Sequence, residues 1–222
     1  MSALHKTSGR WRLGLALSLV TVATWGVLPI FLRLLLEVMD APTITWYRFL
    51  MAAAFTSWIL LRSRNLPKLR GMSRGILGLI VLAIVGLCGN YICFLLGLDR
   101  MTAASAQIVI QLGPLFLLLG SLAVFKEPFS WRQGLGGVVF VLGLLLFFNQ
   151  RLDQLLDGGS AYAMGALLIV GASAAWCVYA LAQKQLLKTY SSAQILLILY
   201  IAAVAVYTPT SKPAGILELN GF

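Results

Sequence analysis

Seven long apolar runs, separated by short polar segments, dominate the sequence. Two of them carry no charge at all, from Gly75 to Leu98 and from Met101 to Phe125. Such runs are far longer than a membrane β-strand and lack its alternation, and unpaired backbone groups cannot face lipid, so each run predicts a spanning helix. The predicted helices cover residues 13–36, 43–61, 75–98, 101–125, 133–150, 160–183 and 191–208. The predicted fold class is therefore an all-α polytopic membrane protein with seven transmembrane helices.

Composition agrees with a membrane location, because 60% of the 222 residues are hydrophobic and only 11% are charged. Soluble domains average roughly 45–50% apolar and about 25% charged residues. Disorder needs low hydrophobicity, and a nucleic-acid-binding surface needs basic residues on a solvated face, so neither class fits a mean hydropathy of +0.90. We therefore expect the lipid bilayer, and no nucleic acid, as a partner of this chain.

The basic residues are distributed unevenly between the two sides of the predicted bundle. Twelve Lys and Arg residues lie on one side, in the N-terminal tail, in the segment 62–74 and after the fourth and sixth helices, with Glu127 as the single acid. The other side holds four basic and six acidic residues. Short loops rich in Lys and Arg stay in the cytoplasm. The distribution predicts a multi-pass protein of the bacterial inner membrane with a cytoplasmic N-terminus.

Few residues of the chain are suited to catalysis or to metal binding. The only histidine, His5, lies in the polar N-terminal tail, and the three cysteines lie inside apolar runs without a Cys-x-x-Cys spacing. No Asp or Glu occupies the middle of a predicted span. The sequence therefore predicts no enzyme, no catalytic residue, no cofactor and no metal site.

Three amide side chains lie within predicted spans, where polar groups are costly unless they have a partner or a function. Gln107 and Gln111 are four residues apart, so they share one face of the fourth helix, ahead of Pro114. Asn90 lies in the outer half of the third helix, beside a glycine-rich stretch. Each amide either lines a substrate path or hydrogen-bonds a neighbouring helix as a packing contact.

Two tryptophans lie near the middle of predicted helices, although tryptophan normally gathers at membrane interfaces. They are Trp25 in the first helix and Trp176 in the sixth. A mid-membrane indole faces protein or a cavity, where its N–H can find a partner. Tyr179 follows Trp176 by three residues, on the same helix face. These aromatic residues are candidates for the lining of a substrate path, with core filling as the alternative.

Arg48 is the one charged residue well inside a predicted span, about five residues into the second helix. The interpretation that we prefer from the sequence alone is that it reaches toward the outer surface or pairs with Glu37 or Asp40. The alternative is a counter-charge for an anionic group of a substrate. In that second role Arg48 would be a charge partner within the substrate path.

A weak internal repeat relates the first helix to the sixth. A shift of 151 residues places Trp25 on Trp176 and matches several small and aliphatic neighbours. Because five spans separate the matching helices, the second copy would be inverted in the membrane, as in transporters that work by alternating access. We therefore expect residues 1–150 to form a first five-helix repeat and residues 151–222 to begin a second one, with two helices.

Short motifs occur in a specific order along the chain. They are Trp25-Gly26 in the first helix, Arg48 in the second, Met101–Ala106 entering the fourth, Pro114-Leu115-Phe116 within it, Phe125–Phe129 after it, and the glycines between Gly134 and Gly143. In order and spacing these motifs resemble the EamA-type branch of the drug/metabolite transporter superfamily. The resemblance covers essentially the whole chain. It implies ten spans in two inverted repeats and export of metabolites such as amino acids, and hence a chain truncated three helices short at its C-terminus.

The leading hypothesis is an exporter or exchanger of small metabolites or drugs that works by alternating access. Its small-molecule substrate would contact Trp25, Asn90, Gln107, Gln111, Trp176 and Tyr179. Without an intramembrane carboxylate, we expect exchange or facilitated diffusion rather than proton coupling. If the chain is a natural truncation, we expect a homo-oligomer or a complementing half. The alternative is a seven-helix receptor-like or structural membrane subunit without transport activity, which predicts an external N-terminus.

Overall fold

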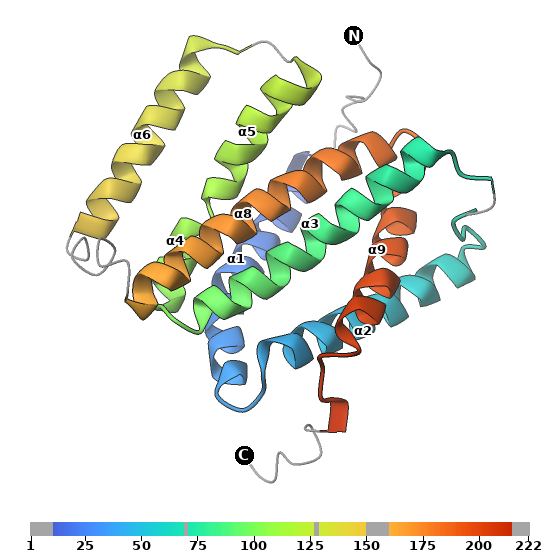
Figure 1. The fold of residues 1–222 in the computed structure, drawn as a ribbon. Coiled ribbons are helices and arrows are strands. Elements are labelled where there is room, and N and C mark those ends of the chain that lie inside the picture. The colour runs from blue at the N-terminus through green and yellow to red at the C-terminus, as the bar shows by residue number, and fades with distance from the viewer. Residues whose placement is uncertain (1–10, 69–70, 127–128, 150–159, 215–222) are drawn as a thin grey trace.

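Helices make up all the regular secondary structure that the computed structural model describes, in residues 11–68, 71–126, 129–149 and 160–214 (Figure 1). The long helices and their bounds are α1 (Trp11–Leu36), α2 (Ala41–Arg62), α3 (Arg74–Leu98), α4 (Ala103–Val109), α5 (Leu112–Phe125), α6 (Trp131–Phe148), α8 (Ala161–Leu186) and α9 (Ser192–Tyr207). Most of these bounds lie within two or three residues of the predicted ones. The clear exception is the predicted fourth span.

Polar residues between the apolar runs mark the starts of six helices. In each case the side-chain oxygen of the N-cap residue accepts a hydrogen bond from the backbone N–H three residues later, which satisfies a donor that the first turn leaves unpaired. The caps are Asp40, Ser73, Thr102, Ser130, Ser160 and Ser191. Ser130 and Gln133 form a reciprocal capping box, so α6 begins at Trp131 and not at the predicted residue 133.

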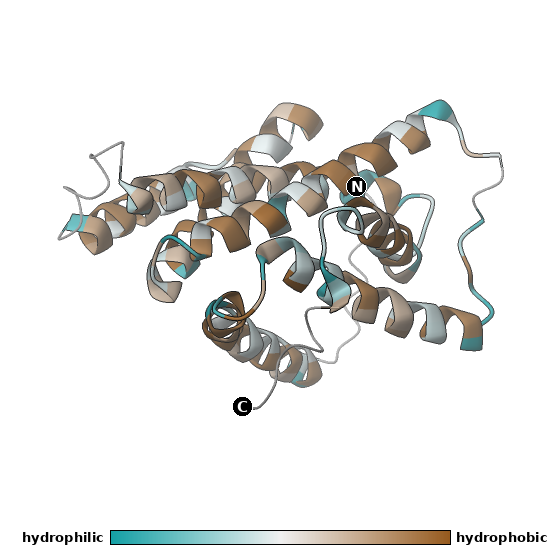
Figure 2. Ribbon diagram, turned by 60° about the horizontal axis from the view of Figure 1, so that its bottom comes forward, coloured by the Kyte–Doolittle hydropathy of each residue, from teal (hydrophilic) through white to brown (hydrophobic). Residues whose placement is uncertain are grey.

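Six described segments are long and apolar enough to cross a membrane, namely α1, α2, α3, the α4–α5 pair, α6 and α8. The predicted seventh span is the shorter apolar helix α9, whose 16 residues extend about 24 Å. Figure 2 shows that apolar residues dominate the helices and that hydrophilic residues gather toward helix ends and connections. The predicted fold class, an all-α polytopic membrane protein, is confirmed.

The predicted fourth span, 101–125, is divided into α4 and α5 and is not one continuous helix. Pro114 has no N–H and cannot donate to the carbonyl of Ile110, four residues earlier. That carbonyl instead accepts from the backbone N–H of Gly113 at 3.0 Å and from the hydroxyl of Ser173 on α8 at 3.4 Å. A proline break is tolerated at membrane depth where a neighbouring helix can supply such a donor.

The most extensive packing in the bundle joins α3 to α8, which run side by side across Figure 1. A Cβ added to Gly86 would lie 2.6 Å from the backbone nitrogen of Tyr179 and 2.7 Å from the carbonyl oxygen of Ala175. These distances leave no room for a side chain, so glycine is what lets the two backbones approach. Since α3 and α8 fall in different predicted repeats, this packing joins the two predicted units.

The short helix α9 packs on α2 and also contacts α3. Phe49 of α2, which is 1% exposed, lies at this junction, with its ring 4.6 Å from that of Tyr91 and 5.8 Å from that of Tyr200. The hydroxyl of Tyr207 donates to the carbonyl oxygen of Cys88 on α3 at 2.6 Å. These aromatic contacts fix α9 against α2 and α3, beside the cavity described below.

Among the described helices, α1 and α6 have the smallest fractions of residues buried by the rest of the chain. Only Pro29 and Leu32 are buried in α1, and only Phe148 is buried in α6. Soluble monomers rarely expose apolar patches larger than a few hundred square ångströms. The uncovered faces of α1 and α6 are therefore suited to contact with lipid acyl chains, as a membrane protein requires.

Candidate functional site

A cavity of about 360 Å³ opens where α1, α2, α3, α4, α5, α8 and α9 converge. Much of its wall is apolar, with contributions from Leu28, Leu87, Phe94 and Ile110. All seven residues singled out from the sequence line it: Trp25, Arg48, Asn90, Gln107, Gln111, Trp176 and Tyr179. The structure thus brings these residues, which come from five segments of the chain, to one place. Contact between them and a substrate stays a prediction.

Asn90 lines the cavity and also joins two helices. Its amide Nδ2 donates to the backbone carbonyl of Ala172 on α8 at 2.9 Å. This bond is the packing contact that the sequence offered as one alternative. This bond uses only the amide nitrogen. The oxygen Oδ1 accepts no hydrogen bond from the described residues, so it stays available to a ligand in the cavity.

Gln107 and Gln111 make no side-chain hydrogen bond to any described part of the chain. The packing alternative requires a bond to a neighbouring helix, and the described residues provide none. Gln107 is half-buried in α4, whereas Gln111 is exposed at the break between α4 and α5. Gln111 is the N-cap residue of α5, yet its side chain does not cap the helix. Both amides are therefore available to a ligand in the cavity.

The two tryptophans meet the cavity in different ways. Trp25 is 56% exposed on α1, so its ring is accessible from the side of that helix. Trp176 is half-buried and packs against the start of α5, where a Cβ added to Gly113 would lie 3.2 Å from its Cε3 atom. Tyr179 is half-buried one turn further along α8. Trp176 and Tyr179 therefore both contribute aromatic side chains to the α8 side of the cavity.

Arg48 points to an aromatic ring and not to a carboxylate. Its Cζ lies 4.6 Å from the centroid of the Tyr91 ring on α3, within the range of a cation–π contact. The pairing of Arg48 with Glu37 or Asp40, one half of the interpretation that we preferred from the sequence, is wrong. The other half, an Arg48 side chain that reaches toward the outer surface, stays a prediction. Asp40 uses its carboxylate to cap α2, accepting from the N–H of Thr43 at 2.8 Å, and eight residues of helix separate it from Arg48 by about 12 Å.

Tyr200 is a cavity residue that the sequence reasoning did not single out. It lies in the short helix α9, and its ring packs against Phe49. The feature that could have identified Tyr200 from the sequence is the one that identified Trp25. Both are aromatic residues with a polar group near the middle of an apolar run. Tyr91, on the neighbouring face of α3, completes the aromatic wall around Arg48.

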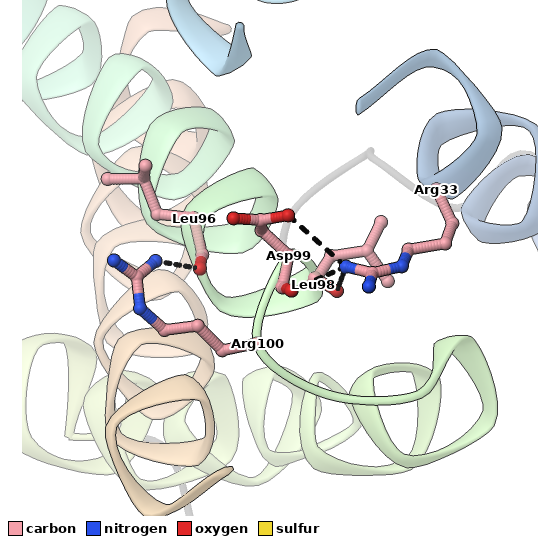
Figure 3. A network of polar contacts seen from close by, with 5 residues as sticks. All are labelled: Arg33, Leu96, Leu98, Asp99 and Arg100. Atoms are coloured by element: carbon pink, nitrogen blue, oxygen red, sulfur yellow. Dashed lines mark hydrogen bonds and ion pairs between the residues drawn. The ribbon is translucent and has the colours of Figure 1, made fainter. Parts of the chain in front are cut away.

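Beyond the cavity, Arg33 at the end of α1 reaches the last turn of α3 (Figure 3). Its Nη1 donates to the carbonyl oxygens of Leu98, at 3.0 Å, and of Asp99, and lies 3.3 Å from Oδ1 of Asp99. A guanidinium at the carbonyl end of a helix complements both the free carbonyls and the helix dipole. Among the described residues this is the only ion pair, and it joins the ends of α1 and α3.

Comparison with known proteins decides the family. Residues 12–149 match the model of the EamA-like transporter family. The chain belongs to this family. The match extends from α1 to the end of α6 and confirms the resemblance to EamA-type transporters that the motifs indicated. The family that this match identifies is one of transporters.

The EamA-family relatives are similar over most of this chain. The chain is 36% identical over 209 residues to a protein of Escherichia coli K12 named "Uncharacterized inner membrane transporter YhbE", covering 94% of this chain and 65% of that protein. It is 35% identical over 208 residues to an "Uncharacterized transporter" of Haemophilus influenzae, covering 94% and 67%. For the "Uncharacterized transporter YyaM" of Bacillus subtilis, identity is 24% over 177 residues, covering 78% and 57%. The chain thus spans about 65% of the length of the first of these relatives.

Proposed function

We propose that this chain forms the substrate path of a bacterial inner-membrane transporter, an exporter or exchanger of small metabolites or drugs such as amino acids. The observation that carries the proposal is the cavity of about 360 Å³, lined by amide side chains and by aromatic rings from both predicted repeats. Membership in the EamA-like family and relatives named as inner membrane transporters support it.

The cavity has the size and chemistry that a small solute requires. Binding sites for small molecules occupy roughly 300–1,000 Å³ and combine apolar walls with a few polar groups that fix orientation. Here Gln107 and Gln111 supply amide donors and acceptors without partners among the described residues. The rings of Trp25 and Trp176 supply apolar faces that can cover the body of a substrate.

The break between α4 and α5 supports a mechanism of alternating access. The carbonyl of Ile110 is not held by an α-helical bond, so α4 and α5 can tilt against each other at lower cost than a continuous helix can bend. Interrupted helices beside a midplane binding site recur in secondary transporters. Gln111 stands at the break and lines the cavity, so movement of either half would reshape the binding site.

The charges around the cavity support exchange or facilitated diffusion. Among the described residues that line it, none is Asp or Glu. Intramembrane carboxylates are the common carriers of coupling protons in transporters. The lining that is described therefore offers a substrate polar contacts but offers a proton no carboxylate.

The test is counterflow in liposomes that contain the purified 222-residue chain. Vesicles loaded with a mixture of unlabelled amino acids should accumulate the corresponding labelled amino acids from outside, and empty liposomes should not. Gln111→Ala and Trp176→Ala should each reduce the initial rate about tenfold or more. The matched control is Trp131→Ala, because Trp131 is 72% exposed on α6, outside the cavity.

The outcomes separate the assignment of function from the assignment of residues. Counterflow that is unchanged by Gln111→Ala and Trp176→Ala would show that the cavity is not the path. The absence of counterflow for any amino acid would contradict amino-acid exchange by this chain. Equal loss in Trp131→Ala and Trp176→Ala would assign both effects to stability.

A further inference from the structure

The guanidinium of Arg48 lines the cavity without an anionic partner. None of its N–H groups donates a hydrogen bond to a described residue, and the single ion pair of the described chain, between Arg33 and Asp99, lies elsewhere. Its Cζ lies over the Tyr91 ring, 4.6 Å from the ring centroid. Arg48 thus brings a full positive charge and five free donors to the cavity.

An aromatic face is only a partial substitute for water or for a counter-ion. Burying a cation is costly unless it is paired, and a cation–π contact offsets part of that cost. The contact with Tyr91 places an aromatic ring beside the guanidinium, but no described residue accepts a hydrogen bond from the N–H donors along the guanidinium edge. This edge matches the two oxygens of a carboxylate in a bidentate pair.

We propose that Arg48 binds the carboxylate of the transported solute and makes the cavity selective for solutes that carry one carboxylate. The inference rests on the proposed function, in which the cavity is the substrate path. A single cation with no Asp or Glu beside it in the described lining gives the cavity one net positive charge. One charge matches a carboxylate better than it matches a phosphate dianion, which is usually held by several cations.

The remaining walls define the rest of the solute. Aromatic side chains from α1, α3, α8 and α9 surround the space, including Trp25, Phe94 and Trp176. These rings can cover an aromatic or aliphatic body, and the free amides of Gln107 and Gln111 can bond a neutral polar group on it. The expected solute is therefore a small monocarboxylate with an apolar body and a hydrogen-bonding group.

The test uses two probes of almost identical shape that differ in charge. N-acetylphenylalanine carries a carboxylate, and N-acetylphenylalaninamide replaces it with a neutral amide. Their binding to the purified 222-residue chain in lipid nanodiscs can be followed by the fluorescence of the tryptophans excited at long wavelength, where the probes do not absorb. The native chain should bind the carboxylate probe at least tenfold more tightly than the amide probe.

Variants at Arg48 identify the source of the preference. Arg48→Gln should abolish it, and Arg48→Lys should keep part of it because the charge remains without the bidentate fork. The matched control is Arg62→Gln, the same substitution on the same helix at an exposed position, which should bind both probes as the native chain does. Size-exclusion profiles of all variants check that the fold is kept.

Each result bears on one proposal or the other. Equal affinity for the two probes, failure of both probes to bind, or a preference that survives Arg48→Gln would overturn the role of Arg48. Amino-acid counterflow without a charge preference would overturn that role and leave the transport proposal standing. A charge preference in nanodiscs without counterflow in liposomes would support the anion site and contradict transport by this chain.

Discussion

Gly97 of α3 and Gly165 of α8 exclude a side chain from each other's position. A Cβ added to Gly97 would lie 2.8 Å from the carbonyl oxygen of Gly165, and a Cβ added to Gly165 would lie 3.0 Å from the carbonyl oxygen of Gly97. The obstacle on each side includes backbone, which cannot rotate away as a long side chain can. Together with Gly86, this pair makes the α3–α8 contact a place where the two helices meet almost backbone to backbone.

Gly97→Ala should therefore destabilise the bundle, although alanine favours a helix more than glycine does. Overpacking of a close contact costs about 1–3 kcal/mol, which exceeds the gain in helix propensity of about 1 kcal/mol. The measurement is thermal unfolding of the purified chain in detergent. Gly78→Ala, on the same helix but with nothing within 4 Å of the added Cβ, should leave the midpoint unchanged or raise it. Equal midpoints for the two variants would show that α3 and α8 are not this close.

Arg33→Ala should cost more stability than Asp99→Asn. The ion pair is exposed, with side chains 42% and 54% accessible, and such pairs contribute about 0–1 kcal/mol. Asp99→Asn removes only this pair, whereas Arg33→Ala also removes two hydrogen bonds to carbonyl oxygens at the end of α3, each worth about 0.5–1.5 kcal/mol. The same unfolding assay measures both losses. A larger loss for Asp99→Asn would reverse the assignment of Arg33 as a helix-end cap.

Pro114→Ala should stabilise the chain and slow transport. Alanine restores an N–H that can bond the carbonyl of Ile110, so α4 and α5 can join into one helix. If the break serves as a hinge, a straightened helix should reduce the counterflow rate several-fold while the unfolding temperature rises. Unfolding temperature and initial rate measured on the same preparation test this opposition. A variant with unchanged counterflow would show that the break is not needed for movement.

The N-terminus should lie in the cytoplasm, as the distribution of Lys and Arg predicts. Fusion of a reporter that is active only in the cytoplasm should give a signal at the N-terminus and after α2, near Arg62. The same reporter after α1, near Asp40, should be silent, and a periplasmic reporter should give the opposite pattern. A periplasmic N-terminus would contradict the predicted orientation and favour the receptor-like alternative.

Much of the cavity could be predicted because a polar residue in a long apolar run is conspicuous. Gln107, Gln111 and Asn90 stood out on cost alone, since membrane interiors tolerate few unpartnered amides. The sequence could not show whether each amide lines a substrate path or hydrogen-bonds a neighbouring helix. That depends on which atoms of the facing helix lie opposite the amide. The backbone carbonyl of Ala172 is such a feature, and no pattern of side chains reveals it.

The errors have physical causes as well. Hydropathy describes side chains, so it located the fourth span, which the structure keeps at Ala103–Phe125. It gave no sign that the helix is interrupted within that span, because the interruption depends on a backbone donor absent from Pro114. Closeness in sequence favoured Asp40 as the partner of Arg48, but Asp40 is already used as a cap at the start of α2. Three points stay predictions. They are the repeat boundaries, the partner that a natural truncation would need, and the substrate.

The glycine contact between α3 and α8 has a consequence for how the chain is made. The ribosome completes α3 first, and α4, α5 and α6 must be inserted before α8 arrives. During that interval the surface around Gly86 and Gly97 lacks the helix that packs closely against it. Arrival of α8 supplies that helix, so a synthesis pause just before residue 160 would leave this surface of α3 uncovered.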